Sequence, residues 1–163
     1  MRVLLTILAI CLPTAAMALS CIPPNAGREL NVWLEKGHKV TVVSGVLTPV
    51  GRAPRRIGKQ DVTHPYRLVG TELTRARGDR PFAQDILFTS NCVIEWCGPL
   101  PSEPQEGLFL LRKRNGAQLE LVTGPCRAGM YQTNRLYLDA LRRCLAKGQC
   151  GEKELKMLSF SRG

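Results

Sequence analysis

Residues 108–122 read LFLLRKRNGAQLELV, and this stretch decides the fold class. Two apolar runs that suit β-strands flank the dipeptide Asn115-Gly116. Asn and Gly adopt the positive φ that a tight hairpin turn requires more readily than other residues do. The stretch therefore predicts a β-hairpin, and with it a protein built on a β-sheet.

Three further strands are expected before this hairpin, at 39–50, 66–80 and 82–96. Gly45 marks a bend in the first of them. Short helices are expected at 26–38 and 130–150, where apolar residues recur at helical spacing. Because the strands follow one another without crossover helices, the order predicts a mainly β fold with flanking N-terminal and C-terminal helices, in which the five strands form an antiparallel barrel.

The first residues, MRVLLTILAICLPTAAMALS, have the pattern of a secretory signal peptide. A positive charge at Arg2 precedes an apolar run and then a zone of small residues. Cleavage after Ala18, which makes 1–18 the signal peptide, and cleavage after Ser20 both fit. The apolar run is too short for a transmembrane helix, and no later stretch approaches the required length. We expect a secreted or periplasmic protein; the sequence ALSC leaves a lipid anchor at Cys21 as the alternative.

Removing residues 1–18 leaves 145 of the 163 residues, enough for one domain at 19–150 followed by a basic tail at 151–163. The loss of Arg2 leaves 22 basic against 13 acidic residues, a net charge of +9. Such a surplus attracts polyanions. Two loops carry a basic cluster that could line one rim of a barrel: Arg52, Arg55, Arg56, Lys59, Arg75, Arg77 and Arg80. These loops offer few aromatic platforms for stacking bases, so a glycan or lipopolysaccharide fits them better than nucleic acid.

Six cysteines remain after the signal peptide is removed: Cys21, Cys92, Cys97, Cys126, Cys144 and Cys150. An even number in an exported chain indicates three disulfides, for which about 15 pairings exist. The tetrad WCGP at 96–99 is shared with the active site of thioredoxins. However, the second cysteine of that motif is replaced by Leu100, and prolines follow where its helix should run. We therefore expect Cys97 to be a structural half-cystine, and a thiol redox protein that uses Cys97 is the third functional alternative.

Several segments together resemble the netrin-like domain, the OB-type barrel shared by tissue inhibitors of metalloproteinases and many bacterial exported proteins. They are SCIPP (20–24), VVSGVL (42–47), the pair Cys97-Gly98, GLFLL with LELVTGPC (107–126) and ALRRC (140–144). The resemblance spans Cys21 to about Cys150. It rests on the order of cysteines and elements, with no long identical motif.

The resemblance implies a disulfide map and a contact segment. In the family the chain begins with Cys-x-Cys; here Cys21 takes the second place and Leu19 the first. The resemblance implies the pair Cys21–Cys126. In the family the missing first cysteine would pair with Cys97, which needs another partner here, and Cys92 is the nearest candidate. Cys144 and Cys150 would form the third pair, Cys144–Cys150. The metalloproteinase inhibitors bind the protease zinc through their first residue, so the resemblance implies that the partner-binding segment comprises Leu19, Ser20, Cys21 and Ile22. The missing first cysteine removes the clamp that holds that residue rigid.

No catalytic triad, paired carboxylates or phosphate-binding glycine loop is found in the sequence. The two histidines, His38 and His64, lie in different segments without other metal ligands nearby, so neither a metal nor a cofactor is expected. We expect a non-enzymatic, disulfide-stabilised binding module for a protein partner, for example a protease. An envelope protein that binds polyanions through its basic loops is the second alternative.

Overall fold

The structure is a computed structural model that describes residues 24–159 except 53, 76–77 and 115–117. The expected signal peptide, both cleavage sites and the segment Leu19 to Ile22 lie outside the described residues, as does the Asn115-Gly116 turn. Within the described part of the chain, no helix is long and apolar enough to cross a bilayer.

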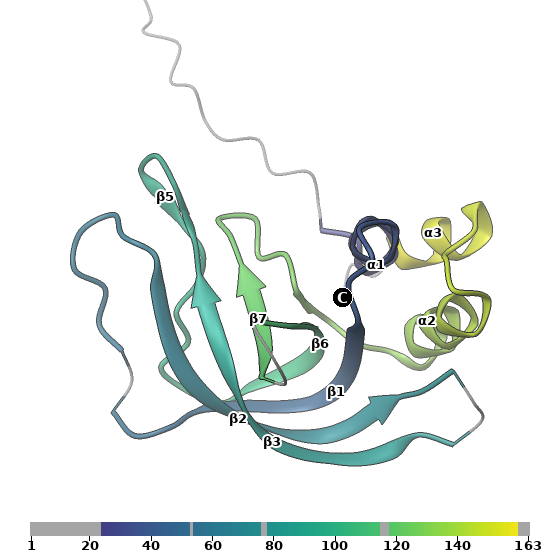
Figure 1. The fold of residues 1–163 in the computed structure, drawn as a ribbon, viewed down its shortest axis with the longest axis horizontal. Coiled ribbons are helices and arrows are strands. Elements are labelled where there is room, and N and C mark those ends of the chain that lie inside the picture. Colours follow the sequence, from purple (N-terminus) through teal and green to yellow (C-terminus); the bar gives the residue numbers. More distant parts are fainter. Residues whose placement is uncertain (1–23, 53, 76–77, 115–117, 160–163) are drawn as a thin grey trace, which may run out of the picture.

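Five strands close a barrel (Figure 1). They are β1 (Val40–Pro49), β2 (Val62–Leu73), β3 (Arg80–Ser90), β6 (Gln105–Lys113) and β7 (Leu119–Thr123). Their order is β1-β2-β3-β7-β6, and β6 pairs with β1 to complete the ring. The expected mainly β barrel is confirmed.

The expectation that all strands are antiparallel is only partly right, because β3 and β7 run parallel over Leu87 to Ser90. The other four neighbouring pairs are antiparallel. A closed ring of five strands cannot alternate direction throughout, so one neighbouring pair must share a direction. The structure places that pair where the hairpin β6–β7 fills the gap between β1 and β3.

Glycines allow the strands to approach closely where they bend. Gly45 of β1 lies opposite Gly70 of β2 and Gly107 of β6. A Cβ on Gly45 would lie 2.2 Å from the carbonyl oxygen of Val69 and 2.7 Å from the Cα of Gly70. Only a residue without a side chain fits at this contact. Gly45 lies in the middle of β1, and β1 curves around the barrel (Figure 1).

Both faces of β6 are buried over Leu108 to Leu111, which explains the continuous apolar run LFLL. Phe109 and Leu111 belong to the core inside the barrel. Leu108 and Leu110 belong to a second core, between the barrel and the helices. A strand that is covered on both faces loses the alternation of polar and apolar residues.

Three helices gather on one side of the barrel (Figure 1): α1 (Ala26–Glu35), α2 (Arg135–Lys147) and α3 (Glu152–Ser159). Asn25 and Asn134 cap the first two, since each side chain accepts a hydrogen bond from a backbone N–H in the first turn. Gly148 ends α2 with a φ of 75°. The expected flanking helices are present, but the helix α3 was not predicted.

The interpretation of 151–163 as a tail is wrong for residues 152–159, which form α3. Leu158 of this helix is only 1% exposed. The disulfide Cys144–Cys150 (S–S 2.12 Å) links the end of α2 to the segment before α3. A Cβ on Gly27 of α1 would lie 2.6 Å from Cδ1 of Leu158, so this glycine lets α1 and α3 pack closely.

Shorter strands complete the fold. β4 (Cys92–Val93) and β5 (Trp96–Cys97) form a small hairpin, and β8 (Met130–Tyr131) adds to the edge of β6. The β2 strand begins at Val62, four residues before the predicted start at Tyr66.

Candidate functional site

The hairpin β4–β5 is clamped to the loop between β1 and β2. Nη1 of Arg56 donates to the carbonyl oxygen of Gln60 (2.8 Å) and to Sγ of Cys92 (2.7 Å). Nη2 of the same residue donates to Oγ of Ser90 (2.5 Å) and to the carbonyl oxygen of Gly98 (3.1 Å). One guanidinium therefore joins the loop to both strands at the base of the hairpin.

Cys97 is bonded to Cys92, with an S–S distance of 2.02 Å, which is the pair expected for these two cysteines. Cys97 belongs to strand β5, and no helix follows it before β6. This geometry differs from that of a thioredoxin site, where the reactive thiol lies at a helix N-terminus and the two cysteines are separated by two residues.

Apolar side chains are exposed at this end of the molecule. In the hairpin, Ile94 is 84% exposed, Trp96 53% and Val93 51%, and Ile57 of the neighbouring loop is 84% exposed. Ile94 has a φ of 57°, a conformation that β-branched residues rarely adopt. The sequence offered no turn residue here, so neither the tip nor its exposure was predicted.

The basic residues predicted to form one rim do not lie together. Those at 52–59 precede β2, whereas Arg75 and Arg80 lie on either side of the turn that follows it. A strand of 12 residues, as β2 is, separates the two groups by up to about 40 Å. The prediction of a single rim is therefore wrong. Arg77 lies outside the described residues.

Two members of that set are engaged in structural contacts. Arg56 is the clamp described above, and Lys59 forms an ion pair and hydrogen bond with Glu95 of the hairpin. Arg52 and Arg55 are exposed in the same loop.

A cleft of about 420 Å³ lies between residues 99–107 and 127–132. Its walls combine apolar side chains (Leu100, Phe109, Met130) with the charged groups of Glu103, Glu106 and Arg127. Cys126, which is disulfide-bonded, immediately precedes Arg127. Its implied partner, Cys21, lies outside the described residues.

A second cleft, of about 630 Å³, lies where the α1–β1 connection meets the β2–β3 turn and α2. Its apolar lining comes from Leu34, Val40, Leu73 and Leu145, and its charged lining from Lys39, Arg75, Arg80 and the acidic Glu72. His38 also lines it. The other histidine, His64, contacts the carbonyl oxygen of Val50 through Nε2 at 3.0 Å.

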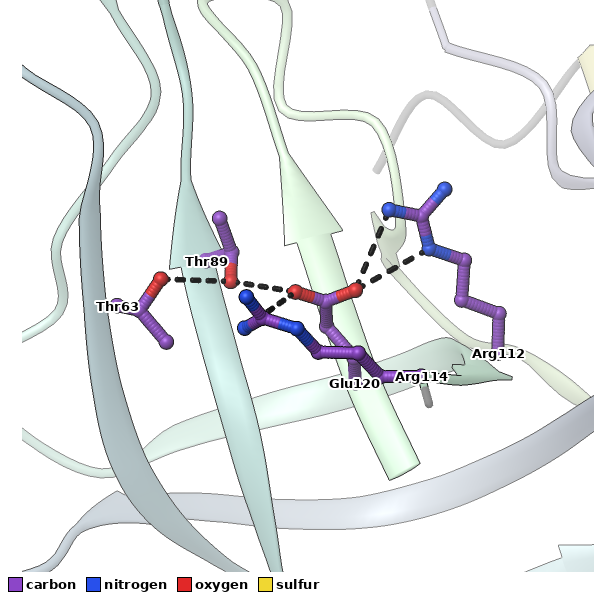
Figure 2. A network of polar contacts seen from close by, with 5 residues as sticks. All are labelled: Thr63, Thr89, Arg112, Arg114 and Glu120. Atoms are coloured by element: carbon purple, nitrogen blue, oxygen red, sulfur yellow. Dashed lines mark hydrogen bonds and ion pairs between the residues drawn. The ribbon is translucent and has the colours of Figure 1, made fainter. Parts of the chain in front are cut away.

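Figure 2 shows a buried carboxylate that the sequence analysis missed, Glu120 of β7. Its side chain accepts hydrogen bonds from Thr89 (2.7 Å), from Nε and Nη2 of Arg112 (3.3 and 3.2 Å) and from Arg114 (3.4 Å). Thr63 and Thr89 share a further hydrogen bond of 3.0 Å. Because Glu120 is 4% exposed and fully partnered, it has the surroundings of a structural group.

A half-buried carboxylate, Glu29, ties α1 to the segment before α2. It accepts hydrogen bonds from the backbone N–H of Gly129 (3.0 Å) and from the hydroxyl of Tyr131. Burial raises the pKa of Glu29, and the hydrogen bonds from Tyr131 and Gly129 oppose this rise. Burial and the adjacent Glu29 carboxylate raise the pKa of Tyr131.

Among the described residues, no group of three or more His, Cys, Asp and Glu side chains is arranged to hold a metal ion. Comparisons of the chain with protein-family models, with curated proteins and with solved structures found no match. The netrin-like resemblance therefore stays a prediction.

Proposed function

We propose that this chain is an exported, non-enzymatic binding module with an OB-type, netrin-like barrel that contacts a protein partner at the cleft between 99–107 and 127–132. The observation that carries the proposal is the position of Cys126. This half-cystine directly precedes Arg127 in the cleft wall. A disulfide from Cys126 to Cys21 would hold the N-terminal segment beside the cleft, so that both would form one contact surface.

The strand order supports an OB-type barrel. OB folds are five-stranded Greek-key barrels that bind ligands along their strands and connecting loops. The ring β1-β2-β3-β7-β6 with a single parallel pair, β3 with β7, is the arrangement of such a barrel. The two disulfides between described residues fit an oxidising compartment outside the cytoplasm.

A non-enzymatic role is supported by how the reactive groups are used. Both oxygens of the buried Glu120 carboxylate accept structural hydrogen bonds, and Oε2 of the half-buried Glu29 accepts two. Cys97 is bonded to Cys92. Each of these groups would have to break a structural contact before it could act on a substrate.

Site-specific photo-crosslinking in the exporting cell tests the proposal. A benzophenone side chain at Gln132, in the cleft wall, should give a discrete protein adduct. The same group at Gln84, an exposed residue of β3, serves as the matched control and should give none. Equal labelling from both positions, or no adduct from Gln132, would count against the cleft as the contact surface.

Dependence on the N-terminus separates an inhibitor-like module from other binders. Leu19, Ser20, Cys21 and Ile22 should contact the partner, so a mature chain extended by one residue should bind it more weakly. If the partner is a zinc protease, the natural mature chain should inhibit it in a dose-dependent manner. Unchanged binding by the extended chain would show that the N-terminal segment takes no part in the contact with the partner.

A second candidate function, polyanion binding, is favoured by the second cleft. Three basic residues, Lys39, Arg75 and Arg80, line it against one acidic residue, Glu72. None of the three has an ion-pair partner among the described residues. Replacing Arg75 and Arg80 by Gln should then weaken salt-sensitive retention on heparin or lipopolysaccharide. Replacing Arg52 and Arg55 by Gln removes the same charge elsewhere and should have a smaller effect.

A further inference from the structure

The hairpin β4–β5 projects beyond the barrel (Figure 1). Its side chains Val93, Ile94 and Trp96 are apolar and exposed. Val93 and Trp96 form a cross-strand pair, and Ile94 and Glu95 connect the two strands. Ile57, in the loop that Arg56 clamps to this hairpin, adds a fourth exposed apolar side chain. We name the group of Ile57, Val93, Ile94 and Trp96 the apolar tip.

Two unfavourable features coincide at Ile94. It is the first residue of a two-residue connection and has a positive φ, a position that favours glycine in hairpins. A β-branched side chain costs free energy in this conformation. In addition, its exposed side chain gains none of the free energy that burial of an apolar group provides. A residue that is unfavourable for both folding and solvation points to a surface that is covered when the protein is at work.

The hairpin is held at its base by the Cys92–Cys97 disulfide and the Arg56 guanidinium. An exposed ion pair from Lys59 to Glu95 ties its connection to the neighbouring loop. Little conformational freedom is therefore lost when the tip inserts into another phase, which favours binding.

The charge and shape of the apolar tip indicate which surface it contacts. Arg52 and Arg55 are exposed in the same loop as Ile57, and the whole chain carries a formal net charge of +10. A convex apolar tip with a tryptophan beside basic side chains suits the interface of a bilayer, where indole rings lie at headgroup depth and cations meet anionic lipids. We propose that the apolar tip docks this protein on a membrane surface that carries anionic phospholipids. This contact is separate from the proposed protein contact at the first cleft, so either can fail without the other.

Vesicle binding tests the proposal directly. The mature protein should sediment with vesicles of equal parts phosphatidylcholine and phosphatidylglycerol, less at about 1 M salt than at about 0.1 M, and poorly with phosphatidylcholine alone. In a Trp33→Phe variant, Trp96 is the remaining one of the two tryptophans. Its emission should shift to shorter wavelength on binding and should be quenched by brominated lipid chains.

Substitutions distinguish the tip from other basic surfaces. Ile94→Asn combined with Ile57→Asn should lower the vesicle partition coefficient about tenfold or more, since two apolar side chains leave the interface. Val69→Asn removes an apolar side chain that is 50% exposed on β2, and should leave partitioning unchanged. Ile94→Asn alone should not lower the stability to urea, because Asn tolerates a positive φ better than Ile does.

Three results would overturn the proposal. One is the absence of binding to the anionic vesicles. Another is binding that the double substitution leaves unchanged, which would mean attraction through basic residues alone. The last is a combination of two observations: brominated lipid chains do not quench Trp96, and a benzophenone at Val93 captures a discrete protein. That combination would make the tip a protein-docking surface.

Discussion

Nη1 of Arg56 lies 2.7 Å from Sγ of Cys92, so a residue of the basic loop is built into the base of the neighbouring hairpin. The same side chain reaches Ser90 and the carbonyl oxygen of Gly98. Arg56, which the sequence analysis grouped with the exposed basic residues, thus helps to hold the apolar tip in position.

Replacing Arg56 by Ala should therefore destabilise the protein. Hydrogen bonds from a charged group contribute about 1.5 to 3 kcal/mol, and the partial exposure of Arg56 places the expected loss of unfolding free energy near the lower end. Urea denaturation measures this loss. Arg55→Ala is the matched control, since Arg55 is exposed, and should change the free energy by less than about 0.5 kcal/mol. Equal effects of the two substitutions would contradict the clamp.

Because β1 and β2 approach closely at Gly45, replacing this glycine by Ala should destabilise the protein more than the same change at Gly124. Gly45→Ala should lower the unfolding free energy by about 1 to 3 kcal/mol or more, because its Cβ would meet the backbone of Val69 and Gly70. Gly124→Ala is the control, since a Cβ there meets nothing within 4 Å. A neutral Gly45→Ala variant in thermal or urea unfolding would show that the barrel does not bend tightly at this contact.

The raised pKa of Glu29 predicts a pH-dependent stability. In the unfolded chain this carboxyl titrates near 4.5, whereas burial raises its pKa in the folded protein. Between the two pKa values the native state binds more protons, so the contribution of Glu29 to stability is complete below pH 4.5 and falls as pH rises through the folded pKa. The neutral Glu29→Gln variant lacks this loss. Its unfolding free energy should therefore improve relative to wild type as pH rises.

Urea unfolding of both proteins at a series of pH values measures that difference. Glu35→Gln, at the exposed end of the same helix, shows the effect of removing a carboxyl from α1 in general. A Glu29→Gln variant whose unfolding free energy, relative to wild type, stays constant or falls on raising the pH would contradict the raised pKa of Glu29.

The three tyrosines of the chain should ionise late. Burial raises the pKa of Tyr66 and of Tyr137 to about 12. The hydroxyl of Tyr66 also donates a 2.6 Å hydrogen bond to the carbonyl oxygen of Pro101. Ultraviolet titration of the native protein should show no tyrosinate near pH 10, whereas the protein in concentrated urea should titrate there. A native step near pH 10 would mean that at least one ring is accessible to water.

The sequence predicted the barrel because its signals were local. The run LFLL and the alternating LELV around Asn115-Gly116 both form strands, and the apolar residues at helical spacing within 130–150 form α2. The parallel pair could not be read from the sequence, because it arises from the closure of the ring. The helix α3 was missed because its burial depends on Gly27 and on the turn that the Cys144–Cys150 disulfide makes.

The candidate sites were less predictable because they depend on register and on contacts between distant segments. A two-residue Asn-Gly turn would place Leu111 opposite Glu120, whereas the structure pairs Arg112 with Glu120. A shift of one residue changes every cross-strand partner, so the network in Figure 2 could not be foreseen. The role of Arg56 depends on a hairpin 36 residues further along the chain.

The central claim is that the N-terminal segment is tied to the cleft through Cys126. Tryptic mapping of the unreduced mature protein tests it most directly. The account predicts that the peptide 115–127, which contains Cys126, is linked to the peptide that contains Cys21, while 144–147 is linked to 148–153 and Cys92 and Cys97 share one peptide. A Cys21 that is found free, lipidated or joined to any other cysteine would contradict the account.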